Sequence, residues 1–262
     1  MIDFSKLPTA SDKNIAVKVK PAAERAIKQG HPWVYEDAIS KPSASGKSGD
    51  LAVIYDKKKN KFLAVGLYDP DSPIRIKILQ SGAPAQINHA WFEAKLQQAQ
   101  AIRQPRIEQG ITGYRLVYGE SDHFPGLIID RYADTLVMKL YTLAWFPHVP
   151  TLLSALQQTI AFERLVLRLS RAIEVNPYGL FDGQILIGDA VTQPITFIEN
   201  DLQLQADVIH GHKTGFFFDQ RDNRQRVREL AHNRSVLDVF SYVGAFTVYA
   251  LAGGATSVTA LD

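Results

Sequence analysis

The chain has 262 residues, of which 46% are hydrophobic, and its 29 basic and 27 acidic side chains leave a net charge of only +2. This apolar content is enough for a packed core and excludes an intrinsically disordered protein. At roughly 100–200 residues per domain, the length predicts one large domain or two to three small ones. No apolar run approaches the roughly 18 residues of a membrane span. Residues 1–6 show no secretory signal, so we expect a cytoplasmic protein with no membrane partner.

Cysteine is absent from the sequence. Disulfides, thiolate-bound metals and a cysteine nucleophile are therefore excluded within these 262 residues. His123, His210 and His212 have no neighbours at metal-ligand spacing, so we expect no metal partner.

Short apolar stretches in residues 1–80 alternate with polar residues or are bounded by charged turns, which is typical of β-strands. The predicted strands are Ile15–Val19, Leu51–Tyr55, Phe62–Leu67 and Ile74–Leu79. Pro21 opens a short helix that Gly30 can close, and Pro42–Asp50 is a loop rich in Ser, Gly and Lys. We therefore expect a small β-barrel-like domain over residues 1–80.

The same segment holds 14 basic and 9 acidic residues, whereas the rest of the chain has no basic excess. Basic side chains beside aromatic ones, as in His31–Ile39, suit the backbone and the unstacked bases of RNA. The candidate RNA-binding residues are Lys18, Lys20, Arg25, Arg75 and Lys77. The alternative is a solvated lysine-rich surface, with Trp33 in the core.

A linker at Ser81–Ala85 leads to a region, residues 88–205, in which helical and strand patterns mix. The predicted helices are Asn88–Gln104 and Pro147–Ile160. The predicted strands are Tyr114–Tyr118, Leu127–Asp130, Thr135–Tyr141, Leu165–Leu169, Ile185–Ile187, Ile195–Ile198 and Leu202–Ile209. This mixture predicts a central α+β domain.

The last segment, residues 206–262, changes to the order helix, strand, glycine loop, helix, strand. Its predicted elements are a helix over Asp219–His232 with Asp219 as its N-cap, a strand over Val236–Phe240, a helix over Gly244–Leu251 and a strand over Thr256–Leu261. This order is the opening of a doubly wound α/β sheet.

The loop between Phe240 and Gly244 has the position of a ligand-binding turn, because it exposes backbone N–H groups before a helix. Asp262 follows Phe240 by 22 residues, which is about where an acid holds ribose hydroxyls in such folds. Only one glycine of the dinucleotide fingerprint is present, so S-adenosylmethionine, which lacks phosphates, fits better than a nicotinamide or flavin dinucleotide. Asp238 either serves the cationic end of the methionine moiety or merely caps the helix.

A second candidate stretch is His212–Arg224, HKTGFFFDQRDNR. Gln220 and Arg221 begin the helix that leads to the cofactor strand, and from there they can reach the pocket. The alternative is that Phe216–Phe218 is interface core and the arginines lie on the surface.

Together with VLDVFSYVGAFTVYALAGGATSVTALD, this stretch closely resembles the RlmI-type family of ribosomal RNA large-subunit methyltransferases. The resemblance extends to HPWVYEDAI, to Gly66–Leu79 and to Tyr118–Tyr132, and so spans nearly the whole chain. It implies an N-terminal PUA-like β-barrel that binds RNA, a central α+β domain and the start of a Rossmann-like methyltransferase domain.

The resemblance also implies an S-adenosyl-L-methionine site. The residues implied to line it are Lys213, Thr214, Gln220, Arg221, Asp238, Phe240, Tyr242 and Gly244, with Asp262 holding the ribose. The family includes cytosine-5 methyltransferases of large-subunit rRNA, and that chemistry needs a thiolate.

The sequence departs from the family pattern in two ways, because it has no cysteine and it stops after the second strand of the last sheet. We therefore expect a fragment of a longer enzyme that lacks the catalytic residues. We further expect the uncovered strand Thr256–Leu261 to make a homodimer or swapped contact, or to be disordered. The leading hypothesis is an RNA methyltransferase, and the alternative is a non-catalytic RNA-binding protein.

Overall fold

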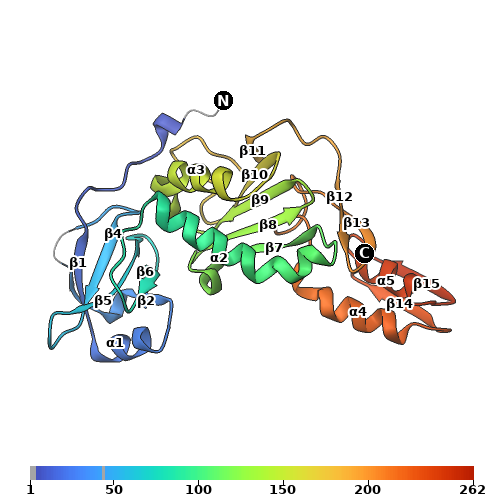
Figure 1. Cartoon of the computed structure of the whole chain (residues 1–262), viewed down its shortest axis with the longest axis horizontal. Coiled ribbons are helices and arrows are strands. Elements are labelled where there is room, and N and C mark those ends of the chain that lie inside the picture. The colour runs from blue at the N-terminus through green and yellow to red at the C-terminus, as the bar shows by residue number, and fades with distance from the viewer. Residues whose placement is uncertain (1–3, 43–44) are drawn as a thin grey trace.

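The computed structural model describes residues 4–42 and 45–262, and its sheets follow one another from the N-terminus to the C-terminus along the long axis (Figure 1). Residues 1–3, part of the segment 1–6 that shows no secretory signal, and residues 43–44 of the predicted loop Pro42–Asp50 lie outside the described residues. Within the described ranges, no helix combines the length and the apolar character that crossing a membrane requires.

The N-terminal part is a mixed six-stranded sheet. In spatial order its strands are β2 (Trp33–Tyr35), β6 (Ile74–Ser81), β5 (Phe62–Tyr68), β4 (Leu51–Tyr55), β1 (Ile15–Val19) and β3 (Ile39–Pro42). Strand β1 buries every second residue, as its alternating sequence predicts. Its buried face packs with Ile54 and Ile76 in a core of its own, next to helix α1 (Pro21–Lys28). Strands β2 and β3 were not predicted, since three or four residues are too short to show a period.

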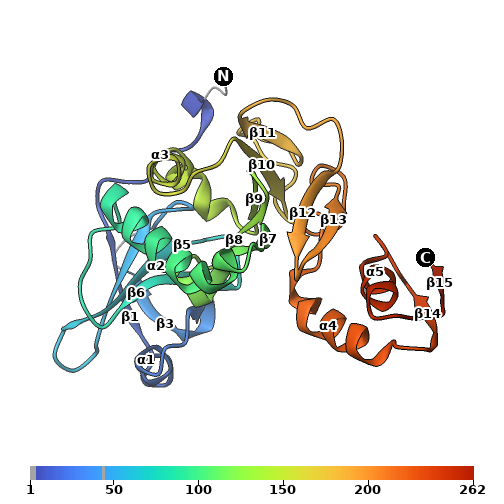
Figure 2. The ribbon, with the colours of Figure 1, turned by 45° about the vertical axis from the view of Figure 1, so that its right-hand side comes forward.

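The middle of the chain is a five-stranded sheet. Its strands, in spatial order, are β11 (Gln184–Ile187), β10 (Arg164–Leu169), β9 (Thr135–Leu140), β8 (Leu127–Tyr132) and β7 (Gly113–Tyr118). Helices α2 (His89–Glu108) and α3 (Val149–Thr159) lie over one face of it (Figure 2). Asn88 caps α2 by accepting a hydrogen bond from the Trp91 amide.

Alternation along the central strands gives the sheet two buried faces. In β9, Leu136, Met138 and Leu140 join the core under α2 and α3, whereas Val137 joins a second core. This second core contains Phe197 from the hairpin of β12 (Ile195–Glu199) and β13 (Leu202–Ala206). The hairpin lies between the central sheet and the C-terminal elements (Figure 2).

The C-terminal part lies at the right-hand end of the molecule in Figure 1. It is made of β14 (Ser235–Val239), α5 (Ala245–Ala252) and β15 (Ser257–Leu261). The two strands are parallel and in register, and α4 (Arg221–Leu230) packs beside α5. The predicted cap at Asp219 is wrong, because a 3₁₀ turn over Phe218–Gln220 precedes α4 and Gln220 is the capping position. Strand β15 is formed and pairs with β14 within the chain, so a second copy on its other edge stays a prediction.

Candidate functional site

A cavity of about 380 Å³ lies at the carboxyl ends of β14 and β15. The loop 240–244 follows β14, and Asp262 directly follows β15, so parallel pairing brings both to the same edge. The cavity is lined mainly by aromatic and apolar groups: His212, Phe216, Phe217, Gln220, Arg224, Phe240, Ser241, Tyr242, Val243, Ala245, Phe246 and Asp262. Open α/β sheets bind their ligands at this edge.

Loop 240–244 is held in an unusual backbone conformation. Phe240, Tyr242 and Gly244 have φ angles of +60°, +51° and +68°, a region that disfavours residues with a Cβ by roughly 1–2 kcal/mol. Hydrogen bonds hold the loop against the end of β15: the Tyr242 amide donates to Asp262 Oδ1 at 2.9 Å and the Ser241 amide donates to the Leu261 carbonyl at 3.0 Å. Strain of this kind is typical of functional loops.

The Tyr242 hydroxyl ties the loop to the segment before α4. It accepts a hydrogen bond from the His212 amide at 2.9 Å and donates to the Gly215 carbonyl at 3.2 Å. Phe217 meets the Tyr242 ring edge-on at 5.6 Å. Phe240, by contrast, is 87% exposed at the cavity, so an apolar ring is available to a ligand.

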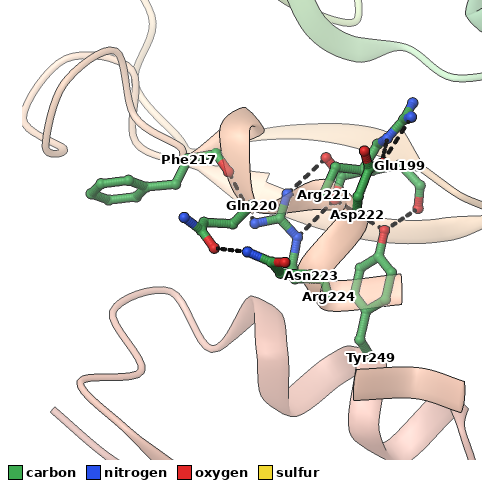
Figure 3. Close-up of polar contacts among 8 residues, drawn as sticks. All are labelled: Glu199, Phe217, Gln220, Arg221, Asp222, Asn223, Arg224 and Tyr249. Carbon is green, nitrogen blue, oxygen red and sulfur yellow. Dashed lines mark hydrogen bonds and ion pairs between the residues drawn. The ribbon is translucent and has the colours of Figure 1, made fainter. Parts of the chain in front are cut away.

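A buried polar cluster supports the cavity from the side of α4 (Figure 3). The Arg224 guanidinium donates three hydrogen bonds of 2.7–2.8 Å to the Glu199 carboxylate and one to the Phe217 carbonyl. The Tyr249 hydroxyl donates to Glu199 Oε1 at 3.0 Å. Burial raises the pKa of Glu199 against the opposing effect of Arg224, and burial together with Glu199 raises the pKa of Tyr249. The cluster joins α4 and α5 to the β12–β13 hairpin and so fixes one wall of the cavity.

The structure brings together part of the predicted cofactor set. Gln220, Phe240, Tyr242 and Asp262 line the cavity, and Gly244 caps α5 within the same loop. The Gln220 side chain also accepts a hydrogen bond from Asn223 at 2.8 Å, which orients its amide (Figure 3).

Four predicted cofactor residues lie elsewhere and have other partners. Asp238 caps α5 by accepting from the amide and the hydroxyl of Thr247, at 3.1 and 2.7 Å, which is the alternative stated for it above. Thr214 is buried and donates to Asp130, so it docks its segment on the central sheet. Lys213 lies over the Phe217 ring, with its ammonium 3.6 Å from Asp219. Arg221 lines a different cavity, beside α2.

The predicted RNA-binding residues divide by exposure. Lys18, Lys20 and Arg25 are exposed on the N-terminal sheet and α1. Arg75 forms an ion pair with Glu36 at 2.6 Å. Lys77 is buried, and its ammonium donates to Asp69 at 2.8 Å and to the Ile74 carbonyl at 3.0 Å, so it is not a free surface cation.

Trp33 is only partly buried, so it is not a core residue. Its indole N–H donates to Glu120 of the central part at 3.0 Å. Within residues 4–42 and 45–262, no group of three or more His, Asp or Glu side chains is placed to hold a metal ion.

Glu199, Arg224 and Phe246 contribute to the site but were not predicted. Arg224 lies in an arginine-rich helix, where residue type alone does not separate this buried arginine from the others. Glu199 lies 25 residues earlier, and nothing in the sequence indicates that the two pair.

Two segments of the chain match known protein families. Residues 17–81 match the PUA-like domain, and residues 183–262 match the S-adenosylmethionine-dependent methyltransferases. A ribosomal RNA large subunit methyltransferase of Deinococcus radiodurans is 47% identical over 97% of this chain and 64% of its own length. Ribosomal RNA large subunit methyltransferase I of Tolumonas auensis is 39% identical over 91% of this chain and 60% of its own length.

By sequence, the chain is similar to ribosomal RNA large subunit methyltransferases over nearly its whole length. The resemblance found in the sequence motifs is thereby confirmed. The chain spans less than two thirds of the length of these relatives.

Solved structures confirm the multidomain fold. A putative SAM-dependent methyltransferase from Streptococcus mutans superimposes with a TM-score of 0.79 at 23% identity, over 94% of this chain and 63% of its own. A putative methyltransferase complexed with SAH gives a TM-score of 0.78 at 22% identity, over 95% of this chain and 62% of its own. The N-terminal sheet is therefore PUA-like, and the C-terminal unit has the opening arrangement of a Rossmann-like methyltransferase domain.

Proposed function

We propose that the protein is an S-adenosyl-L-methionine-dependent RNA methyltransferase that acts on large-subunit ribosomal RNA in the cytoplasm. One observation carries the proposal. The segment that matches the methyltransferase family ends in two parallel strands whose carboxyl ends, strained loop and terminal acid converge on one cavity. The names of the relatives support the RNA substrate.

The residues at the cavity fit S-adenosylmethionine. The volume of about 380 Å³ is in the range of small-ligand pockets. Phe240, Phe217 and Phe246 offer aromatic surface to an adenine ring, and the Asp262 carboxylate can accept hydrogen bonds from two ribose hydroxyls. Among the described residues, the lining contains no lysine, and its arginine, Arg224, is paired with Glu199, so a pyrophosphate would meet no unpaired lysine or arginine there. The neighbour of the same fold that was solved with SAH supports this choice.

The chain's own residues would bind and orient the cofactor. Asp262, oriented by the Tyr242 amide, would hold the ribose, Phe240 would cover the adenine ring, and the Gln220 amide would offer a further hydrogen bond. When bound, S-adenosylmethionine supplies a sulfonium-activated methyl group. The remaining predicted cofactor residues have side chains bonded to other partners: Lys213, Thr214, Arg221 and Asp238. We propose that they do not contact the cofactor directly and that they hold in place the segments that line the cavity.

We further propose cytosine C5 as the methylated atom. That reaction requires a thiolate that adds to C6 of the base. Because none of the 262 residues is a cysteine, this chain alone should bind the cofactor without completing methyl transfer.

For the domain division we propose residues 1–80, 88–205 and 206–262. The PUA-like match at 17–81 and the separate core of the N-terminal sheet support the first boundary. The hairpin 195–206 shares a core with Phe216 and Tyr249, so the second and third units are closely joined.

Calorimetric titration of the chain with S-adenosylhomocysteine tests the proposal. We expect saturable binding at one site, and we expect Asp262→Ala to weaken it by about 10- to 100-fold, since two charge-assisted hydrogen bonds are lost. Asp201→Ala, which removes an exposed carboxylate paired with Arg228, is the matched control and should bind as the wild type does. No detectable binding by the wild-type chain would favour the non-catalytic RNA-binding alternative.

A further inference from the structure

Two other cavities meet at one pair of residues on the central sheet. The first, of about 400 Å³, lies between α2, β7 and the start of α4. The second, of about 610 Å³, lies between the N-terminal sheet and the central sheet. Arg115 and Tyr118, both on β7, line both of them. A ligand that crosses this point touches all three parts of the chain.

The smaller cavity, which we call the arginine cavity, is lined by Arg103, Arg106, Arg115 and Arg221. Arg103 and Arg115 are each paired with a buried carboxylate, Asp122 and Asp130. Their positions are therefore fixed, since each guanidinium makes two hydrogen bonds of 2.6–3.0 Å to its partner.

The acids that line the arginine cavity pair with other cations and leave Arg106 without an acidic partner among the described residues. Asp219 faces Lys213, and Asp222 is paired with Arg221. Arg106 has no ion pair among the described residues, and the pKa of its guanidinium is lowered by burial and by the charges of Arg221 and Arg103. The unpaired Arg106 guanidinium, which feels the charges of Arg221 and Arg103, therefore favours an anion.

The larger cavity, which we call the aromatic cavity, is lined in part by aromatic side chains. Trp33, Tyr118 and Tyr141 line it. Tyr118 is 53% exposed, and its ring is held by the Arg115 guanidinium at 5.2 Å, while its amide donates to Asp122 at 2.6 Å. An exposed ring held in place offers a flat surface on which a base can stack.

We propose that the arginine cavity and the aromatic cavity together hold one single-stranded RNA segment, with a phosphate beside Arg106 and Arg221 and an unpaired base stacked on Tyr118. A single strand presents phosphates and bases side by side, which matches a cationic cavity adjoining an aromatic one. An acidic peptide carries no base that could stack in the aromatic cavity. In a duplex the bases are paired and stacked on one another, so none is free to enter this cavity. The choice of RNA rests on the proposed function.

Fluorescence anisotropy with a labelled single-stranded RNA of about 12 nucleotides, titrated at several salt concentrations, tests the inference. Tyr118→Ala should weaken binding by about 5- to 100-fold and leave the salt dependence unchanged, because stacking is uncharged. Arg106→Gln should reduce the slope of log K against log salt by about 0.7, the value for one phosphate contact on a single strand. Tyr118→Phe, which keeps the ring, should bind as the wild type does.

Arg226→Gln is the matched control for charge. Arg226 is an exposed arginine on α4, paired with Glu229, and it lines neither cavity. The inference is overturned if Arg106→Gln and Arg226→Gln change the slope equally, if Tyr118→Ala binds like the wild type, or if a duplex or a poly-glutamate peptide competes as well as single-stranded RNA.

Titration of the same variants with S-adenosylhomocysteine separates the inference from the proposed function. Cofactor binding should be unchanged in Tyr118→Ala and Arg106→Gln, because neither residue lines the cofactor cavity. If the wild-type chain binds RNA through these residues but does not bind the cofactor, the proposed function fails and the inference stands. If it binds the cofactor while the RNA measurements show no effect of the variants, the inference alone fails.

Discussion

Buried ion pairs hold individual charged side chains of this protein in single positions. Arg224 with Glu199, and Lys77 with Asp69, are almost completely withdrawn from solvent. In both pairs the carboxylate accepts further hydrogen bonds, from Tyr249 or from Thr142, so its remaining lone pairs are used. Removing one partner of such a pair leaves a buried charge without compensation.

We expect Lys77→Met to lower the free energy of unfolding by about 3–5 kcal/mol, since it leaves the buried Asp69 carboxylate without a positively charged partner. Urea denaturation measures this change. Lys18→Met, at an exposed lysine on β1, is the matched control and should cost less than about 0.5 kcal/mol. Equal, small effects of the two substitutions would show that Lys77 is a solvated surface lysine, which is the alternative to RNA binding.

For single residues, the sequence predicted which side chains lie at the edge of the C-terminal strands better than it predicted what each side chain contacts. Asp262 and Phe240 lie at the carboxyl edge as predicted, because spacing along two strands determines which residues reach it. The contacts of Thr214 and Lys77 were not predicted, because their partners, Asp130 and Asp69, are brought to them by tertiary structure. The sequence around a single polar residue does not show whether its side chain will contact a ligand or a buried carboxylate.

Helices α4 and α5 approach each other closely beside the cavity at the ends of β14 and β15. A Cβ on Gly253, just after α5, would overlap the backbone carbonyl of Arg228 on α4. Glycine is required there for space, whereas at Gly244 it is required for a φ of +68° in open surroundings. These elements were predicted from their periodicity and their glycines, but their contact was not, since periodicity does not determine how close two backbones come.

Gly253→Ala should therefore destabilise the protein by about 2–3 kcal/mol, because the Arg228 backbone cannot move without shifting α4. Gly244→Ala, which introduces a Cβ without a clash, should cost about 1–2 kcal/mol from backbone strain alone. Thermal unfolding of both variants compares the two effects. A cost at Gly253 no larger than at Gly244 would contradict close packing of α4 on α5.

Over the whole molecule, the N-terminal sheet is docked on the central part by apolar and polar contacts. Leu67 and Leu79 of that sheet belong to the central core. The buried His148 donates from Nε2 to the Gly49 carbonyl at 2.7 Å. The order of the three units was predictable from composition and periodicity, whereas this docking joins residues 99 positions apart and leaves no local pattern.

Burial lowers the pKa of His148, although Gly49 and Asp50 oppose the shift. The unfolded chain, with a histidine pKa of about 6.5, then binds a proton that the folded protein does not, so stability falls as the pH drops from about 7 toward 5. His148→Gln can keep a donor to Gly49 and cannot titrate, so the loss of stability on acidification should be smaller in this variant.

Urea denaturation at several pH values between about 5 and 7.5 measures the difference. Burial also lowers the pKa of His123, so wild-type pH dependence has a second source, and adding His123→Gln should flatten the curve further. An unchanged pH dependence in His148→Gln would mean that this histidine is not held neutral at the interface.

The most direct test of the account is the place where S-adenosylmethionine binds. Ultraviolet irradiation of the chain with methyl-labelled S-adenosylmethionine, followed by peptide mapping, locates the bound cofactor. We predict label within residues 212–246 or at Asp262, competed by S-adenosylhomocysteine and reduced in Asp262→Ala. Label in the arginine or aromatic cavity, or no competed label at all, would contradict a cofactor site at the carboxyl ends of β14 and β15.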